Sequence, residues 1–507
     1  MKDSHISRII RGGGVGLIGE GVFLLVGFII VFLSIKILGP REYGVFVLAL
    51  TIVNILDVIC KQGLHRGMLK QITQYRVQGM NTEANAIFRY SLIRTFTIAL
   101  VGSLICIGAS ESIVNFFNKE QILQTYLIVL AFTLPATVAF AIFLSALQVV
   151  GRVQEMVLLE NVYKPCITVC LLALLYFFST HTSVGDWKTI VFLGIQLFIS
   201  VIICIMAYAR LHDSDLSPFG PRKDFNRKEY LHFSYPLLFQ GIINLLATWT
   251  STLMIGYFIV DPQGVGAFNV IFKISSFCVL ALTSLDRVFA PIIGELYYNN
   301  SRGDLLRIYR SVTKWSLICA FLVFTAIVLL GRDVLTLFDA SYNVAYIPLI
   351  ILSVGRVLDA SVGSVAYILL MIGESKIIFY NSLFVLVVNI VLNYLMVPRW
   401  GLWGGAIATS LSYCIKNIVW LVFVMHKTSI HPYDKSYFKT VGIFLICFLG
   451  VLIPAQFLPL HWFYDSLKLL VFFLLFGIAY WCWGVDDLDQ NILRMVNKRL
   501  GINLKQS

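Results

Sequence analysis

Long apolar stretches and short polar segments alternate along almost the whole chain. Each apolar stretch has about 20 residues, the length that a helix needs to cross the hydrocarbon core of a membrane. Backbone amides inside lipid must form hydrogen bonds within their own segment, so we expect a helix at every stretch. The pattern predicts an all-α integral membrane protein with fourteen transmembrane helices. Their centres lie near Phe28, Thr51, Gly102, Pro135, Thr168, Phe198, Thr248, Cys278, Phe321, Gly355, Val387, Leu411, Phe448 and Phe473.

The turn between the first two stretches returns in the middle of the chain. Residues 39–46 read Gly-Pro-Arg-Glu-Tyr-Gly-Val-Phe, and residues 261–268 read Asp-Pro-Gln-Gly-Val-Gly-Ala-Phe. At this offset of 222 residues the proline, the second glycine and the phenylalanine of the two turns align. A chance match among apolar helices is the alternative. We favour an internal repeat, because two structural halves are a common plan among transporters.

The repeat and the longest charged linker, which follows helix 6, set the predicted domain boundaries. We predict an N-lobe with helices 1 to 6 over residues 1–220 and a C-lobe with helices 7 to 12 over residues 221–436. Helices 13 and 14 and a cytoplasmic tail follow over residues 437–507. Ser234 and Pro236 predict the start of helix 7, because serine caps helices and proline suits a first turn.

The net charge of +12 would suit a nucleic-acid partner, but its distribution indicates a membrane protein. Basic residues gather at both termini and in alternate loops, which is the pattern of the positive-inside rule. We therefore expect both termini in the cytoplasm and no nucleic-acid partner. Residues 61–87 are expected to form a polar cytoplasmic segment. The opposite loops have little basic charge beyond Arg41, Lys119, Lys188, Arg332 and Arg399.

The ten cysteines lie in or at the edge of apolar stretches, and we interpret them as small apolar residues. No cluster of histidines or carboxylates accompanies them to complete a metal site. The sequence contains no Walker motif that would indicate direct use of ATP. We therefore expect neither a metal nor an organic cofactor.

Two motifs connect the chain to a known family. The first is Leu-Gly-Pro-Arg-Glu-Tyr-Gly-Val-Phe at residues 38–46, and the second is Pro-Arg-Trp-Gly-Leu-Trp-Gly-Gly-Ala-Ile-Ala-Thr at residues 398–409. With the division into six, six and two helices, these motifs resemble the O-antigen-type flippases. These polysaccharide and oligosaccharide-lipid flippases belong to the multidrug/oligosaccharidyl-lipid/polysaccharide exporter superfamily. The resemblance implies two six-helix lobes around a central cavity that opens alternately to either side.

The resemblance also implies a function and partners. Such proteins move a glycan on a polyprenyl (pyro)phosphate carrier across the cytoplasmic (inner) membrane for polysaccharide biosynthesis. The implied partners are the lipid-linked oligosaccharide and the membrane lipids, and glycan-assembly proteins are further candidates. The motifs are specific for the fold and do not identify the sugar.

Several basic residues are predicted to lie deep in the membrane, where burial in lipid is costly. Lys273, Arg356 and Lys416 all belong to the second half, and they suit an anionic headgroup in a polar cavity. The alternative is an ion pair that only connects helices. Arg66 and Arg287 fall at inner helix ends and are further candidates, with snorkelling to the interface as their alternative.

Three acidic residues are candidates for coupling transport to an ion gradient. Glu20, Asp57 and Asp359 lie within apolar stretches, where acids carry protons or bind Na⁺. H⁺ or Na⁺ is therefore the candidate coupling ion. The alternatives are a bond to a neighbouring polar helix for the first two acids and, for Asp359, an ion pair with Arg356, three residues before it.

Two other function classes fit less well. An ion-coupled multidrug or cation antiporter of the same superfamily would favour an acidic cavity and usually has twelve helices. A membrane glycan polymerase or glycosyltransferase would need a large external loop or a carboxylate-rich loop, and the outer loops are short. We therefore predict a transporter and not an enzyme.

Overall fold

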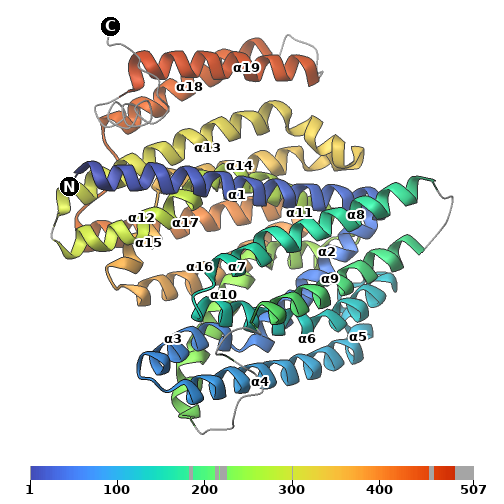
Figure 1. Ribbon diagram of the computed structural model, residues 1–507. Helices are drawn as coiled ribbons and strands as arrows, with labels where there is room; N and C mark the ends of the chain where they lie inside the picture. Colours follow the sequence, from blue (N-terminus) through green and yellow to red (C-terminus); the bar gives the residue numbers. More distant parts are fainter. Residues whose placement is uncertain are drawn as a thin grey trace. The chain divides into compact units, whose positions relative to one another are not determined.

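The computed structural model describes residues 2–181, 187–211, 216, 225–299, 301–455 and 462–485. The regular structure in these ranges is helical, and fourteen of its helical segments are long and apolar enough to cross a membrane (Figure 1). Each of the fourteen predicted centres falls inside one of them. The predicted fold class, an all-α multi-pass membrane protein, is confirmed.

The chain divides into two compact units, which we describe separately. The N unit comprises Leu25–Asn269 and Val397–Gly401, and the C unit comprises Met1–Leu24, Val270–Met396 and Leu402–Ser507. This division does not test the predicted lobe boundaries, which stay a prediction.

The helices of each unit are as follows. The N unit contains α2 (Pro40–Lys61), α3 (Leu64–Val77), α4 (Asn81–Gly108), α5 (Ser110–Phe117), α6 (Ile122–Val149), α7 (Val153–Leu158), the π-helix η1 (Leu159–Tyr163), α8 (Lys164–His181), α9 (Trp187–Leu211) and α10 (Arg227–Phe258). The C unit contains the 3₁₀-helix η2 (Phe277–Val279), α12 (Leu280–Tyr298), α13 (Arg302–Phe338), the 3₁₀-helix η3 (Ala340–Ala345), α14 (Tyr346–Val362), α15 (Val365–Met371), α17 (Leu402–Thr428), α18 (Lys435–Ala455), α19 (Trp462–Ala479) and the π-helix η4 (Tyr480–Gly484). Both units contribute to α1 (Lys2–Leu38), α11 (Gln263–Ser276) and α16 (Ser375–Trp400).

The expected polar segment at residues 61–87 contains a buried amphipathic helix. Leu64, Met68 and Ile72 recur every four residues along α3, and each has an exposed fraction of 0% in the core of the N unit. Positions four apart share one face of a helix, so these three side chains pack while the charged ones between them stay outside. The segment is thus polar on one face of α3 and packed on the other, and its cytoplasmic location stays a prediction.

Helix α10 begins earlier than Ser234 and Pro236 predict. It starts at Arg227, where the side chain of Asn226 caps the helix by accepting a hydrogen bond from the Glu229 amide at 3.2 Å. Pro236 lies inside the helix, and Ser234 donates to the carbonyl of Tyr230 at 2.8 Å. The predicted start of helix 7 was therefore wrong.

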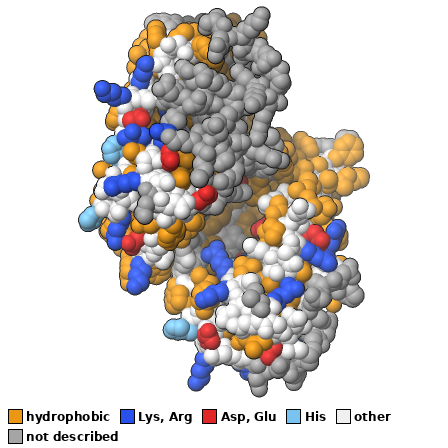
Figure 2. Space-filling view, turned by 60° about the vertical axis from the view of Figure 1, so that its left-hand side comes forward, with side chains coloured by type: hydrophobic (Ala, Val, Ile, Leu, Met, Phe, Trp, Pro, Cys, Tyr) orange, Lys and Arg blue, Asp and Glu red, His pale blue; other side chains and the backbone are white. Residues whose placement is uncertain are grey.

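Within each unit, helix ends that are predicted to share one side of the membrane lie together. In the N unit, Arg152 donates to the carbonyl of Arg210 at 2.8 Å, which joins the ends of two loops that are predicted to be inner. In the C unit, Lys427 pairs with Glu374 at 2.6 Å and so connects two other loops that are predicted to be inner. Figure 2 shows groups of Lys and Arg side chains on the drawn surface, together with some Asp and Glu, and hydrophobic areas beside them. Charged helix ends and apolar flanks are what a spanning bundle needs.

Candidate functional site

The candidate anion site of the C unit lies where α14 and α17 approach closely. A Cβ atom on Gly355 would lie 2.6 Å from the Oγ of Ser410 and 2.8 Å from its Cα, so only glycine fits at this crossing. Gly404 and Gly405 near the start of α17 are also buried, and small residues let helices in a membrane pack closely. The contact places Arg356 and Asp359 of α14 beside Lys416 of α17.

Asp359 is held by α17 and not by its own helix. Its Oδ1 accepts hydrogen bonds from Lys416 Nζ at 3.2 Å and from Asn417 Nδ2 at 2.7 Å. In the described part of the chain, its ion pair is with Lys416 and not with Arg356. Lys416 thus has a counter-charge on the neighbouring helix, so its alternative interpretation as a helix-connecting cation gains support.

Arg356 is the cation of this cluster that keeps free hydrogen-bond donors. Its guanidinium lies over the rings of Phe272 and Tyr413, 4.9 and 4.5 Å from their centroids. Its one hydrogen bond among the described residues is a long contact of 3.5 Å from Nη2 to Ser276 Oγ. Its Nε is buried without a hydrogen-bond partner. Two aromatic rings therefore hold the group in place, and Nη1 forms no hydrogen bond with a described residue.

The other predicted cations are distributed over three helices. Lys273 on α11 is half-buried, and its side chain makes no hydrogen bond or ion pair with the residues that the structure describes. Arg66 lies in the first turn of α3, is exposed, and lines a cavity of about 370 Å³ together with Lys61 and residues of α10. Arg287 belongs to α12, and its side chain lies outside the described part. The binding roles of all three residues stay predictions.

The coupling candidates have different surroundings. Glu20 is half-buried on α1. Asp57 on α2 pairs with Lys61, one turn later, at 2.5 Å and accepts a hydrogen bond from Thr137 of α6 at 3.1 Å. The alternative of a bond to a neighbouring polar helix therefore describes Asp57 well, and its coupling role stays a prediction.

Our sequence interpretation missed the buried acid Asp286. Asp286 on α12 is 8% exposed, and its Oδ1 is buried without a hydrogen-bond partner among the described residues. Asp286 is the last residue of an apolar stretch. A charged residue at such a position is usually interpreted as the beginning of a loop. Asp286 is the seventh residue of α12 and therefore lies inside a helix. The sequence does not reveal this, because it does not show that the helix continues beyond the apolar stretch.

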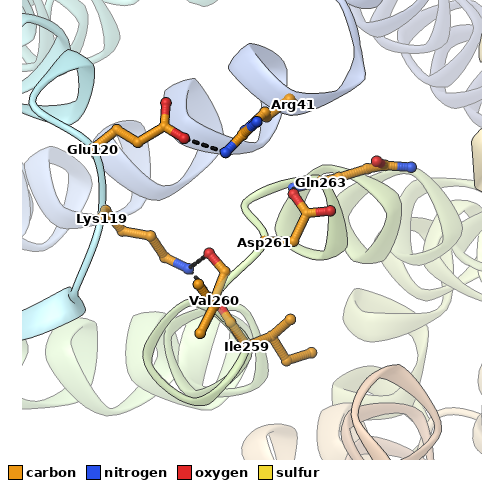
Figure 3. A network of polar contacts seen from close by, with 7 residues as sticks. All are labelled: Arg41, Lys119, Glu120, Ile259, Val260, Asp261 and Gln263. Carbon is orange, nitrogen blue, oxygen red and sulfur yellow. Dashed lines mark hydrogen bonds and ion pairs between the residues drawn. The ribbon is translucent and has the colours of Figure 1, made fainter.

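A polar network joins three turns of the N unit that are all predicted to lie outside (Figure 3). Arg41 pairs with Glu120, and Lys119 donates to the backbone carbonyls of Ile259 and of Val260, the latter at 2.6 Å. Burial lowers the pKa of Lys119, although the carboxylates of Asp261 and Glu120 oppose this shift. The turn between α10 and α11 is thereby held against the turn between α5 and α6.

These observations define a multi-pass, all-α membrane protein with the fold of known transporters. The lipid II flippase MurJ in an inward closed conformation aligns with a TM-score of 0.69 at 14% identity, over 96% of this chain and 99% of that one. An inward-facing multidrug resistance transporter of the MATE family aligns with a TM-score of 0.65 at 15% identity, over 82% and 94%. At these identities the likeness shows the fold alone.

The sequence comparison identifies the family. The model of the polysaccharide biosynthesis protein family matches residues 9–297, more than half of the chain, and the protein belongs to this family. A second model, MatE, matches residues 236–395. The probable flippase AglR of Haloferax volcanii is 25% identical over 397 residues, which is 78% of this chain and 79% of the relative. The resemblance inferred from the two motifs is confirmed.

Proposed function

We propose that the protein is a flippase that moves a polyprenyl-(pyro)phosphate-linked oligosaccharide across the cytoplasmic membrane for polysaccharide biosynthesis. Its relative AglR is named a probable flippase, and its structural neighbour MurJ is named a lipid II flippase. The same proposal includes alternating access as the mechanism, cytoplasmic termini, and contact with glycan-assembly proteins.

The observation that carries the proposal is the set of free donors on Arg356. A guanidinium presents a planar fork of N–H groups that matches two phosphate oxygens at once. The rings of Phe272 and Tyr413 fix its plane, so little side-chain entropy is lost when an anion binds. Because Asp359 is already bound to Lys416 and Asn417, it does not neutralise Arg356 by direct contact. The cluster has two cations for one acid, which favours an anionic ligand.

Cation antiport is the second candidate function, because the MatE model matches residues 236–395. A cationic drug needs a carboxylate without a protein cation beside it. Asp57 and Asp359 each have a lysine within 3.2 Å, so both are already compensated. This argument disfavours a cation site at Asp57 and Asp359. Asp286 forms no ion pair with the described residues, so it is the acid at which antiport remains to be tested.

The test is complementation of flippase-null strains that produce defined lipid-linked glycans. Arg356→Ala should reduce export by roughly tenfold or more at normal membrane levels, because charge-assisted hydrogen bonds to the phosphate are lost. Arg332→Ala is the matched control, since Arg332 also lies over a ring, Tyr346, at 4.7 Å, but is exposed near the end of α13. Failure of the wild-type protein with every glycan would contradict the flippase function. Normal export by Arg356→Ala would contradict the anion site.

We also propose that H⁺ or Na⁺ drives transport through one of the predicted acids. Replacement of Glu20, Asp57 or Asp359 by its amide removes the charge and keeps the shape. Replacement of the acid that couples transport should make export independent of the ion gradient. Unchanged ion dependence in all three variants would exclude coupling through these residues.

A further inference from the structure

A second cavity is lined by residues of the N unit alone. It has a volume of about 370 Å³ and is lined by α2, α6, η1, α8 and α9. Pockets for small molecules start near 300 Å³, so it has room for a small ligand. Glu160 of its wall belongs to the π-helix η1, and single π-turns inside helices are frequent at functional sites.

Four polar side chains of this wall have unused hydrogen-bonding capacity. These are Asn54, Glu160, Lys164 and Gln196, which come from four different segments of the unit. None of them forms a side-chain hydrogen bond or ion pair with any residue that the structure describes, although Lys164 lies 5.7 Å from the centroid of Phe140. The charges of Glu160 and Lys164 attract each other without a direct contact, so all four side chains can still form hydrogen bonds with water or a ligand.

The remaining polar groups of the wall are already satisfied. Thr133, Thr168 and Ser200 donate to carbonyls of their own helices. Asp57 is bound to Lys61 and Thr137. The four free groups are therefore a distinct set, and together they offer both donors and acceptors.

The charges that line the cavity cancel. Asp57 and Glu160 are matched by Lys61 and Lys164, so the wall has no net charge. A phosphate would need an excess of cations, and a metal ion an excess of oxygen anions. The described residues also contain no group of three histidine, cysteine or acidic side chains that would hold a metal. A neutral ligand with many hydroxyl groups fits best, because each hydroxyl both donates and accepts.

We propose that this cavity binds one or two uncharged sugar residues of the transported glycan. The proposal rests on the flippase function and gives the N unit a binding role separate from that of Arg356. Glu160 and the amide oxygens of Asn54 and Gln196 accept bonds from sugar hydroxyls. Lys164 and the amide nitrogens donate to them, and the ring of Phe140 offers an apolar face.

Binding is tested on the full-length protein in nanodiscs by saturation-transfer NMR with methyl glucoside, methyl galactoside and methyl N-acetylglucosaminide. At least one glycoside should give a signal that a soluble oligosaccharide competes away. Asn54→Leu and Gln196→Leu each remove polar atoms at similar volume and should weaken the Kd about tenfold. Gln240→Leu on α10 is the matched control, because the same substitution is made outside this cavity, and it should leave the Kd unchanged.

The outcomes separate this inference from the flippase function. Inorganic pyrophosphate that displaces the glycoside in wild type would show an anion site and overturn the proposal. A glycoside signal that requires Na⁺, or that survives both leucine substitutions, would overturn it as well, as would no signal from any glycoside. In each of these cases, retained export in the complementation assay leaves the flippase function intact.

Discussion

Gly44 lies directly against the carbonyl group of Pro262. A Cβ atom on Gly44 would lie 1.8 Å from the Pro262 oxygen and 2.5 Å from its carbon, well inside any allowed contact. Both residues belong to the turn motif that the sequence repeats, so the two copies of the motif pack on each other. Beside them the Tyr43 hydroxyl donates to Asn269 Oδ1 at 2.8 Å in a buried hydrogen bond. The start of α2 and the turn before α11 are therefore one packed contact.

Gly44→Ala should push the turn before α11 away from α2. The obstacle is backbone, which cannot rotate aside as a side chain can, so overpacking should cost about 1–3 kcal/mol of unfolding free energy. Thermal unfolding of the purified protein measures the loss. Gly194→Ala on α9 is the matched control, because nothing lies within 4 Å of a Cβ at that glycine. An equal effect of the two substitutions would contradict the close contact.

Lys119 should make the stability of the network in Figure 3 depend on pH. Its pKa is lowered by burial from the ordinary value of 10.5, so the folded state disfavours the protonated form. This cost is fully present below the folded pKa and disappears as the pH rises past 10.5. Wild type should therefore gain stability relative to Lys119→Met between pH 7 and about pH 10.5. A relative loss of stability over this range in paired unfolding curves would contradict the lowered pKa.

The pair of Lys416 and Asp359 calls for a double-mutant cycle. Lys416→Met leaves the carboxylate with Asn417 alone, and Asp359→Asn leaves the ammonium without a counter-charge. Each single variant should lose stability, and the double variant should recover part of it, with a coupling of about 1 kcal/mol. Export distinguishes the roles of Lys416. Recovered export in the double variant would assign Lys416 a structural role only. A binding role is supported if the double variant stays deficient while Asp359→Asn alone exports normally.

The exposed pair of Lys427 and Glu374 is the control for this cycle. Its distance of 2.6 Å is shorter, but its side chains are 44% and 30% exposed, against 21% and 15% for Lys416 and Asp359. Solvent screens exposed pairs, so Lys427→Met and Glu374→Gln should couple by roughly 0.5 kcal/mol or less. Equal coupling energies in the two cycles would mean that solvent screens the pair of Lys416 and Asp359 as strongly as it screens the exposed pair.

The membrane spans and the family were predictable from the sequence because lipid allows few solutions. A spanning segment must be apolar, helical and about 20 residues long, so composition alone locates it. The buried face of α3 was also visible, since Leu64, Met68 and Ile72 repeat every four residues, but the charges between them led us to a polar segment. The start of α10 was harder to predict from the sequence, because Asn226 and Ser234 are both good capping residues.

The partners across helices were not predictable. Arg356 and Asp359 are three residues apart, and this spacing suggested a pair within one helix. The partner in the structure, Lys416, lies 57 residues away, and it reaches Asp359 because Gly355 lets α17 approach. The N-unit cavity proposed to bind sugar depends in the same way on packing, because Asn54, Glu160, Lys164 and Gln196 come from four segments. A single sequence contains no measure of which helices become neighbours.

Aromatic rings pack the two additional helices α18 and α19 against α13 of the C unit. The last prediction concerns this packing. The rings of Phe321 on α13 and Phe444 on α18 are 3.7 Å apart and inclined by 4°, and Phe444 also meets Phe472 of α19 edge-on at 6.0 Å. Packing is what holds helices together in a membrane, where lipid is as apolar as the side chains.

Phe444→Ala should therefore destabilise the protein by about 3 kcal/mol, because its buried ring leaves a cavity among three helices. Phe438→Ala on the same helix removes an identical ring that is 63% exposed, against 3% for Phe444, and should change stability little. Thermal unfolding and limited proteolysis between α18 and α19 measure the difference. Similar curves for the two variants would mean that the helix pair is held by other contacts, and that the stack around Phe444 does not anchor it.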